Sequence, residues 1–145
     1  MDQRISLVTF GVSDMTRAKA FYEAMGWTPS GGDGEAVCFF QMPGCVFGLY
    51  GYDALTEDSG QPVGDKDKFG GITISYNVES ESAVDALLAQ AESCGGVIAR
   101  PAIKQFWGGY SGYFADLDGH AWEIAYNPHW TITQSGETRL GSEVE

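Results

Sequence analysis

The stretch VSDMTRAKAFYEAMGW, residues 12–27, decides the fold, because its pattern returns later in the chain. Five pairs lie 66 residues apart: Val12 with Val78, Ala18 with Val84, Phe21 with Leu87, Tyr22 with Leu88, and Met25 with Ala91. Three further pairs lie 75 residues apart: Gly44 with Gly119, Phe47 with Trp122, and Leu49 with Ile124. Residues 5–50 and 71–126 therefore form two copies of one βαβββ module. We expect such modules to bury a shared surface, with a site where they meet.

The local patterns place the same elements in both modules. In the first, a strand at 5–12 precedes a helix that Ser13 or Asp14 caps and Gly26 ends. Strands follow at 27–29, 36–41 and 46–50, with a turn at 31–34. In the second, a strand at 72–78 precedes a helix that begins at Ser80 or Ser82. Further strands are predicted at 97–103, 110–115 and 121–126.

Two segments lie outside the repeat. Residues 51–70 contain Gly, Pro and many charges without a clear period, so we expect a connector between the modules or a flap over a site. Residues 127–145 form a C-terminal tail, polar from residue 131 onward. We expect this tail to lack regular structure or to lie across a second subunit. Together the segments make one domain.

Composition restricts the classes of partner. A net charge of −12 disfavours nucleic acids and anionic membranes as partners. The chain has no apolar run of membrane-spanning length and no basic-then-apolar leader, so we expect a cytoplasmic protein. Its three cysteines follow no CxxC or zinc-knuckle spacing, which agrees with a reducing compartment.

Two segments resemble one known family. Residues 12–27 are similar to the first-helix signature of the vicinal oxygen chelate superfamily, and residues 115–124, ADLDGHAWEI, to its D-P-D-G-H-x-W-E ending, with Leu117 in place of the usual proline. This superfamily includes glyoxalase I, extradiol dioxygenases, fosfomycin-resistance enzymes, methylmalonyl-CoA epimerase and bleomycin-resistance proteins. The resemblance implies an α+β fold whose paired modules form a curved, mainly antiparallel sheet around a central cavity. It also implies a homodimer and, in the enzymes, a divalent metal in that cavity.

The positions that carry the metal ligands in this family supply few donors here. The resemblance places them at Leu7, Gly48, Thr73 and Glu123. Leucine and glycine side chains donate nothing to a metal, a threonine hydroxyl is a poor ligand, and a single carboxylate binds a divalent ion weakly. We therefore predict no metal and no other cofactor. His120 is expected to be a turn or interface residue rather than a metal or proton-transfer group.

Alternation along the strands gives the residues that we expect to face the cavity. The candidate ligand-binding residues are Leu7, Thr9, Gly48, Tyr50, Thr73, Ser75, Trp107 and Tyr110. Glu123 is the one charge among them and the candidate catalytic residue. In the alternative interpretation, Glu123 is not catalytic but is left over from an ancestral metal site, and its carboxylate is now hydrogen-bonded to Thr73 or Ser75.

Two other groups of residues leave alternatives open. The aromatic, glycine-containing run at 106–113 could cover the cavity or form a hairpin packed on the sheet or on a second subunit. Arg100 and Lys104, four residues apart in a strand, are expected to share a face. They would meet either an anionic group of a ligand or solvent at a sheet edge.

Three functions remain. The first is a protein that binds a small organic molecule without a metal, as in the bleomycin-resistance branch. The second is a metal-dependent lyase, isomerase or dioxygenase of the glyoxalase type. The third is a metal-free acid–base enzyme that uses Glu123 with Tyr50 or Tyr110.

Overall fold

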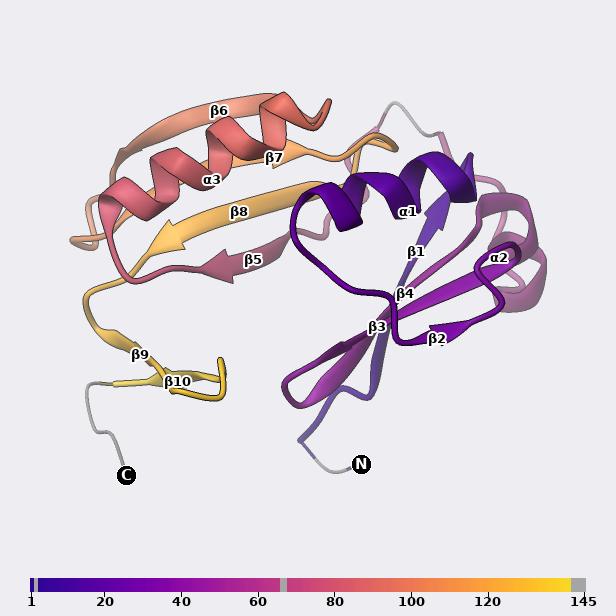
Figure 1. The fold of residues 1–145 in the computed structure, drawn as a ribbon, viewed down its shortest axis with the longest axis horizontal. Coiled ribbons are helices and arrows are strands. Elements are labelled where there is room, and N and C mark those ends of the chain that lie inside the picture. The colour runs from indigo at the N-terminus through magenta and orange to yellow at the C-terminus, as the bar shows by residue number, and fades with distance from the viewer. Residues whose placement is uncertain (2, 66–67, 142–145) are drawn as a thin grey trace. The chain divides into compact units, whose positions relative to one another are not determined.

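The computed structural model describes residues 1, 3–65 and 68–141, and these divide into two compact units. Unit 1 spans Met1–Phe69 and unit 2 spans Gly70–Glu145. Figure 1 shows the elements of each unit in chain order. Each unit is described by itself below.

Unit 1 is a four-stranded sheet with a helix on one face. It contains β1 (Leu7–Val12), α1 (Met15–Ala24), β2 (Gly31–Gly32), β3 (Val37–Met42), β4 (Cys45–Gly51) and α2 (Tyr52–Ser59). The strand order is β1-β4-β3-β2, in which β1 runs parallel to β4 and the other pairs are antiparallel. An aromatic core lies between α1 and this sheet. In it, the Phe47 ring lies 4.8 Å from Phe10 and 5.2 Å from Tyr22 between centroids.

Unit 2 repeats this arrangement. It contains β5 (Ile74–Asn77), α3 (Glu81–Ser93), β6 (Val97–Lys104), β7 (Tyr110–Ala115), β8 (Ala121–Tyr126) and a hairpin of β9 (Trp130–Ile132) and β10 (Thr138–Leu140). Its sheet order is β5-β8-β7-β6, again with a parallel first pair and antiparallel pairs beyond it. The predicted α+β fold with mainly antiparallel strands is confirmed.

The helix ends show the repeat in atomic detail. Asp14 caps α1 and Ser80 caps α3, each by accepting a backbone N–H three residues later. At the other end, Gly26 and Gly95 adopt positive φ angles of 100° and 99°. In α1 the Trp27 N–H then bonds to the Tyr22 carbonyl at 3.0 Å, and the two rings stack at 5.1 Å. Trp27 was predicted to begin a strand, which is wrong, because it anchors the end of α1 instead.

Two other short elements differ from the sequence prediction. The turn predicted at 31–34 contains β2, which pairs with β3. Residues 51–70 were predicted to connect the modules or to cover a site, without a predicted helix, yet α2 forms there, and Gly60 ends it with a positive φ of 65°. Residues 66 and 67 of that segment lie outside the described residues.

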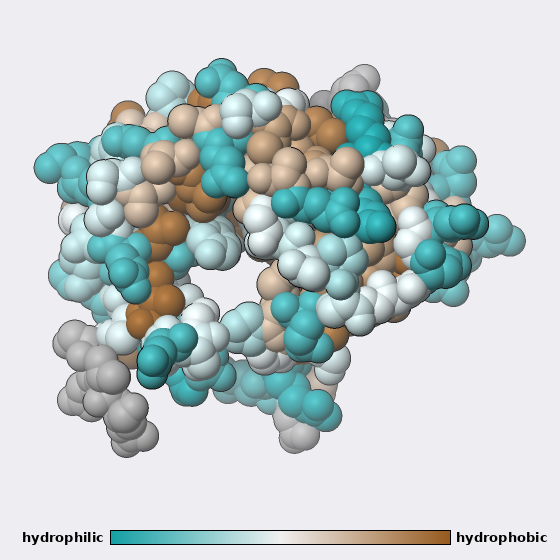
Figure 2. Space-filling model, in the orientation of Figure 1, coloured by the Kyte–Doolittle hydropathy of each residue, from teal (hydrophilic) through white to brown (hydrophobic). Residues whose placement is uncertain are grey.

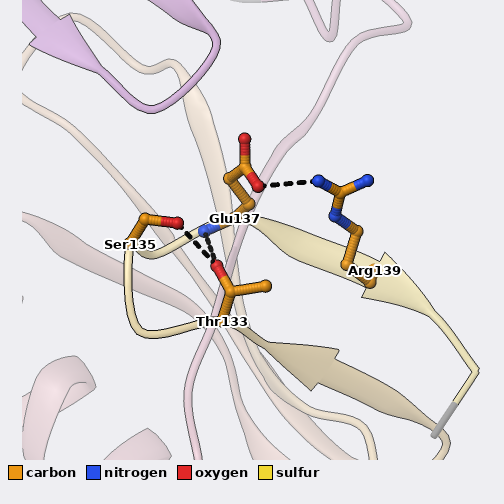
Figure 3. Close-up of polar contacts among 4 residues, drawn as sticks. All are labelled: Thr133, Ser135, Glu137 and Arg139. Carbon is orange, nitrogen blue, oxygen red and sulfur yellow. Dashed lines mark hydrogen bonds and ion pairs between the residues drawn. The ribbon is translucent and has the colours of Figure 1, made fainter. Parts of the chain in front are cut away.

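The C-terminal tail also has structure that the sequence prediction missed. The turn between β9 and β10 is held by the Thr133 hydroxyl, which accepts the Glu137 N–H at 3.0 Å and bonds to the Ser135 hydroxyl at 2.9 Å (Figure 3). Arg139 donates to the Glu137 carboxylate at 2.8 Å. Up to residue 141 the tail therefore forms a hairpin, and residues 142–145 lie outside the described part of the chain.

Hydrophilic and hydrophobic residues are both exposed at the surface. In the view of Figure 2, hydrophilic residues cover much of the surface and hydrophobic ones lie among them. None of the helices in the described residues has the length and apolar character needed to cross a membrane.

Candidate functional site

Each sheet has a face that points away from its long helix, α1 or α3, and we call this the distal face. In unit 1, the strand register sets Thr9 of β1 opposite Gly48 of β4, and Gly48 opposite Phe39 of β3. A β-carbon built on Gly48 would lie 3.2 Å from the Phe39 ring and 3.3 Å from a methyl group of Leu7. The glycine therefore forms the floor of a small apolar surface. Tyr50 shares this face by alternation, so the four candidates of unit 1 lie together.

Helix α2 covers one end of this apolar surface. A β-carbon at Gly11 would lie 2.9 Å from the Tyr52 ring and 3.3 Å from a methyl group of Leu55. Tyr52 also accepts the Gly64 N–H with its hydroxyl at 3.2 Å, which fastens the following loop to the helix. Glycine at position 11 thus permits α2 to pack closely on the distal face of β1.

The distal face of unit 2 carries polar side chains in the same register. Ser75 of β5 pairs with Glu123 of β8, Glu123 pairs with Tyr113 of β7, and Tyr113 pairs with Arg100 of β6. These four residues form a line across all four strands, which we call the polar row. Ser75 and Glu123 correspond to Thr9 and Gly48 of unit 1 by the offsets of 66 and 75 residues.

Interactions within the polar row hold Glu123 in place. The Ser75 hydroxyl donates to the Glu123 carboxylate at 2.7 Å, which confirms one of the two partners expected for this carboxylate. Burial raises the pKa of Tyr113 above its usual value, and the charge of Glu123 and a hydrogen bond with it add to this effect. Tyr113 therefore stays a neutral phenol between a carboxylate and a guanidinium.

Arg100 lies at the other end of the polar row. Its guanidinium carbon is 4.8 Å from the centre of the Tyr113 ring, a cation–π contact. Its Nη2 donates to the hydroxyl of Ser111 at 3.2 Å, and Gln105 Nε2 donates to the same oxygen at 3.1 Å. Ser111 is 1% exposed, so this end of the row is anchored in the interior of unit 2.

The other predicted residues of unit 2 do not join the polar row. Thr73 lies before the first residue of β5 and is exposed. Trp107 lies in the loop between β6 and β7, next to Phe106, which is fully exposed. The Tyr110 hydroxyl donates to Asp85 of α3 at 2.9 Å. Tyr110 therefore lies on the helix side of the sheet, whereas Glu123 lies on the distal face.

Arg100 and Lys104 do not share a face, contrary to the expectation from their spacing. Arg100 bonds to Ser111 on the distal face, whereas Lys104 lies 3.6 Å from Glu81 of α3. The register of β6 against β7 shifts twice between Ile98 and Ile103. Pro101 lies within this stretch of β6, an edge strand, and has no N–H to donate to a hydrogen bond with β7. The side chains of β6 therefore do not alternate regularly between the two faces of the sheet here.

The residues at the family's metal-ligand positions do not fit a divalent metal. Leu7 and Gly48 offer no donor atom, Thr73 offers one hydroxyl, and the Glu123 carboxylate is engaged by Ser75. Across the described residues, no three His, Cys, Asp or Glu side chains gather where they could hold a metal ion. His120 lies in the Asp116–Gly119 turn region, where its backbone N–H donates to the Asp116 carboxylate at 2.9 Å.

Comparison with models of known protein families shows which family this sequence resembles. The sequence model of the Glyoxalase/Bleomycin resistance protein/Dioxygenase superfamily matches residues 4–124. The chain belongs to this superfamily. The match covers both βαβββ modules and ends within β8, one residue after Glu123. The polar row therefore lies within the part of the chain that the family shares.

Solved structures agree with this membership. A crystal structure of a glyoxalase-related enzyme from Fulvimarina pelagi is 35% identical, with a TM-score of 0.88 over 97% of this chain and 99% of that one. The hypothetical protein SA1046 from S. aureus is 22% identical, with a TM-score of 0.75 over 88% and 95% of the two chains. Lactoylglutathione lyase from Agrobacterium tumefaciens, 17% identical with a TM-score of 0.64 over 87% and 95%, shares the fold. No curated protein matched the sequence.

The structure adds residues that the sequence reasoning did not place in the site. Tyr113, Ser111 and Gln105 join Arg100 and Glu123 on the distal face of unit 2. Strand alternation places Ser111 and Tyr113 on one face, so their shared face could have been predicted from the sequence. Their pairing with Glu123 and Arg100 depends on the register of three strands, which local sequence does not determine.

Proposed function

We propose that this superfamily member binds a small organic molecule on the distal face of unit 2 without a metal. The polar row carries the proposal. Its four residues, Ser75, Glu123, Tyr113 and Arg100, lie side by side on the distal face, one on each strand of the sheet. A hydroxyl, a carboxylate, a phenol and a guanidinium offer donors and acceptors in a fixed order. Sites for small molecules use a few such groups, held by a rigid sheet, to orient the ligand.

The apolar surface of unit 1 is a separate candidate surface for binding a small molecule. Leu7 is 46% exposed, and with Phe39 it flanks Gly48, so hydrophobic area is available on that distal face. We retain Leu7, Thr9, Gly48 and Tyr50 as candidate ligand-binding residues of unit 1, considered by itself. Burial of apolar area would contribute affinity without specifying the ligand's orientation.

A second candidate function is metal-free acid–base catalysis. Glu123 and Tyr113 interact directly, which pairs a proton acceptor with a proton donor. The relative from Fulvimarina pelagi is described as a glyoxalase-related enzyme, and its 35% identity favours an enzyme here as well. The partner of Glu123 would then be Tyr113 rather than Tyr50 or Tyr110. Glu123→Gln would abolish turnover and retain binding, whereas a pure binder would show no turnover to lose.

Native mass spectrometry of gently purified protein, without chelator, tests the proposal. We expect an organic mass on the wild-type protein and no stoichiometric divalent ion. The Ser75→Ala, Tyr113→Phe double variant should lose that mass. Tyr110→Phe is the matched control and should keep it, because Tyr110 bonds to α3 on the other face. One divalent ion per chain that disappears in Glu123→Gln would contradict the metal-free proposal and favour the glyoxalase-type alternative.

The same spectrum addresses the assembly. By family resemblance we propose a homodimer, and the mass of the intact species will show whether two chains associate. The described cysteines, Cys38, Cys45 and Cys94, are all free, which suits a reducing compartment such as the cytoplasm.

A further inference from the structure

Within the described residues, Arg100 is a cation without a carboxylate partner. The chain has 20 acidic and 8 basic residues, so most positive charges would be expected to find a negative one nearby. Within the described residues Lys19, Lys68, Lys104 and Arg139 each form an ion pair. Arg100 forms none in that part of the chain, and its contacts are with the neutral Ser111 and Tyr113. A partly buried charge of this kind favours an anion from outside.

The group around Arg100 has more hydrogen-bond donors than acceptors. Its Nε is shielded from solvent and has no hydrogen-bond partner in the described structure. Nη2 carries two N–H bonds and uses one of them on Ser111. Gln105 donates to that same hydroxyl oxygen, so the oxygen accepts two hydrogen bonds and the Ser111 O–H is a further donor. A shielded donor without a partner is unfavourable, and an anion bound by the other N–H groups of the guanidinium would offset that cost through its charge.

We propose that Arg100, Gln105 and Ser111 form a subsite for the carboxylate of a small organic acid. This inference rests on the proposed function and names the chemical class of its ligand. A guanidinium presents parallel N–H bonds in one plane, which match the two oxygens of a carboxylate. The Tyr113 ring fixes that plane from one side. A single guanidinium matches one negative charge, whereas a phosphate dianion is better served by several cations.

The polar row also indicates what the rest of the ligand carries. Arg100 is on β6 and Glu123 is on β8, with β7 between them. Neighbouring strands lie about 4.8 Å apart, so the two backbones are roughly 10 Å apart. An acid with a hydroxyl or amino group at its far end would place its carboxylate at Arg100 and donate to Glu123 or accept from Ser75. Such a polar group would add to the affinity that the carboxylate supplies at Arg100.

Benzoate and benzamide test the subsite, because they have the same shape and differ in charge. Both are titrated at constant ionic strength into the full chain while the Arg100 Nε–H signal is followed by NMR. That signal is identified as the one missing from Arg100→Gln. We expect a saturable shift with benzoate and none with benzamide. The Kd for benzoate, followed on backbone amides of β6 and β7, should rise at least tenfold in Arg100→Gln. It should change less than twofold in Lys104→Gln, the matched control on the same strand.

Other outcomes would overturn the inference. These are equal binding of benzoate and benzamide, unchanged benzoate affinity in Arg100→Gln, or no benzoate binding at millimolar concentration. Tighter binding of inorganic phosphate than of benzoate would overturn the assignment to carboxylates. Arg100→Lys keeps the charge without the planar fork, so an intermediate Kd separates loss of recognition from loss of folding. An organic mass that co-purifies with both wild type and Arg100→Gln would leave the proposed function intact while the carboxylate subsite fails.

Discussion

Replacing Tyr113 with phenylalanine tests whether the polar row is a connected structure. The change removes the hydroxyl that interacts with Glu123 and keeps the ring beneath Arg100. A hydrogen bond to a charged group contributes about 1.5–3 kcal/mol, and Tyr113 is only half-buried, so solvent screening reduces this to about 1 kcal/mol. We therefore expect the free energy of unfolding of Tyr113→Phe to fall by about 1 kcal/mol at neutral pH. Urea unfolding followed by tryptophan fluorescence measures it.

The pH dependence gives the same prediction a second readout. The pKa of Tyr113 is raised in the fold above its usual value of 10.0, so the folded state favours the protonated phenol. That stabilisation is complete below about pH 10 and is lost as the pH rises through the raised pKa. The stability difference between wild type and Tyr113→Phe should therefore shrink as the pH rises above 10. Tyr110→Phe is the comparison: the hydrogen bond with Asp85 also raises the pKa of Tyr110, but this bond is solvent-exposed, so a smaller loss with the same pH dependence is expected. A Tyr113→Phe protein as stable as wild type at every pH would refute the reasoning.

Three further predictions concern the framework that carries the site. Phe47→Ala should lower the free energy of unfolding by about 3–5 kcal/mol in urea, because a 4% exposed ring at the centre of the aromatic core is lost. Gly112→Ala should lower the thermal midpoint, since the new β-carbon would lie 2.8 Å from the backbone nitrogen of Ala102, and a midpoint equal to wild type would show that β6 yields there. Ser80→Ala should cost about 1 kcal/mol by circular dichroism melts, because the Ala83 N–H loses its cap, and no change would argue against capping by this residue.

The sequence was sufficient for the modules because their helices carry a strong pattern. The repeated apolar residues predicted α1 and α3, and Gly26 marked the end of α1. Helix α2 has no such stripe, and none of its residues is buried, so nothing in its local pattern distinguished it from a loop. The β9–β10 turn depends on the Thr133 hydroxyl rather than on apolar alternation, which explains why it was also missed.

The candidate site was predicted only in part, for a physical reason. Glu123 and Ser75 could be placed on one face by alternation, and their hydrogen bond agrees with one of the two expected partners. Tyr113 and Arg100 lie beside them because of the register of β6, β7 and β8, and this register is determined by turns and by irregularities in the strands. The disrupted register around Pro101 also turned Arg100 and Lys104 to opposite sides, against the expectation from simple alternation. The ligand itself depends on side-chain contacts that no local pattern encodes.

A crystal structure of gently purified protein would test the central claim most directly. The account predicts electron density for an organic molecule on the distal face of unit 2, within hydrogen-bonding distance of Glu123 and Arg100. A divalent metal ion bound by Glu123, or a ligand bound elsewhere with the polar row untouched, would contradict it.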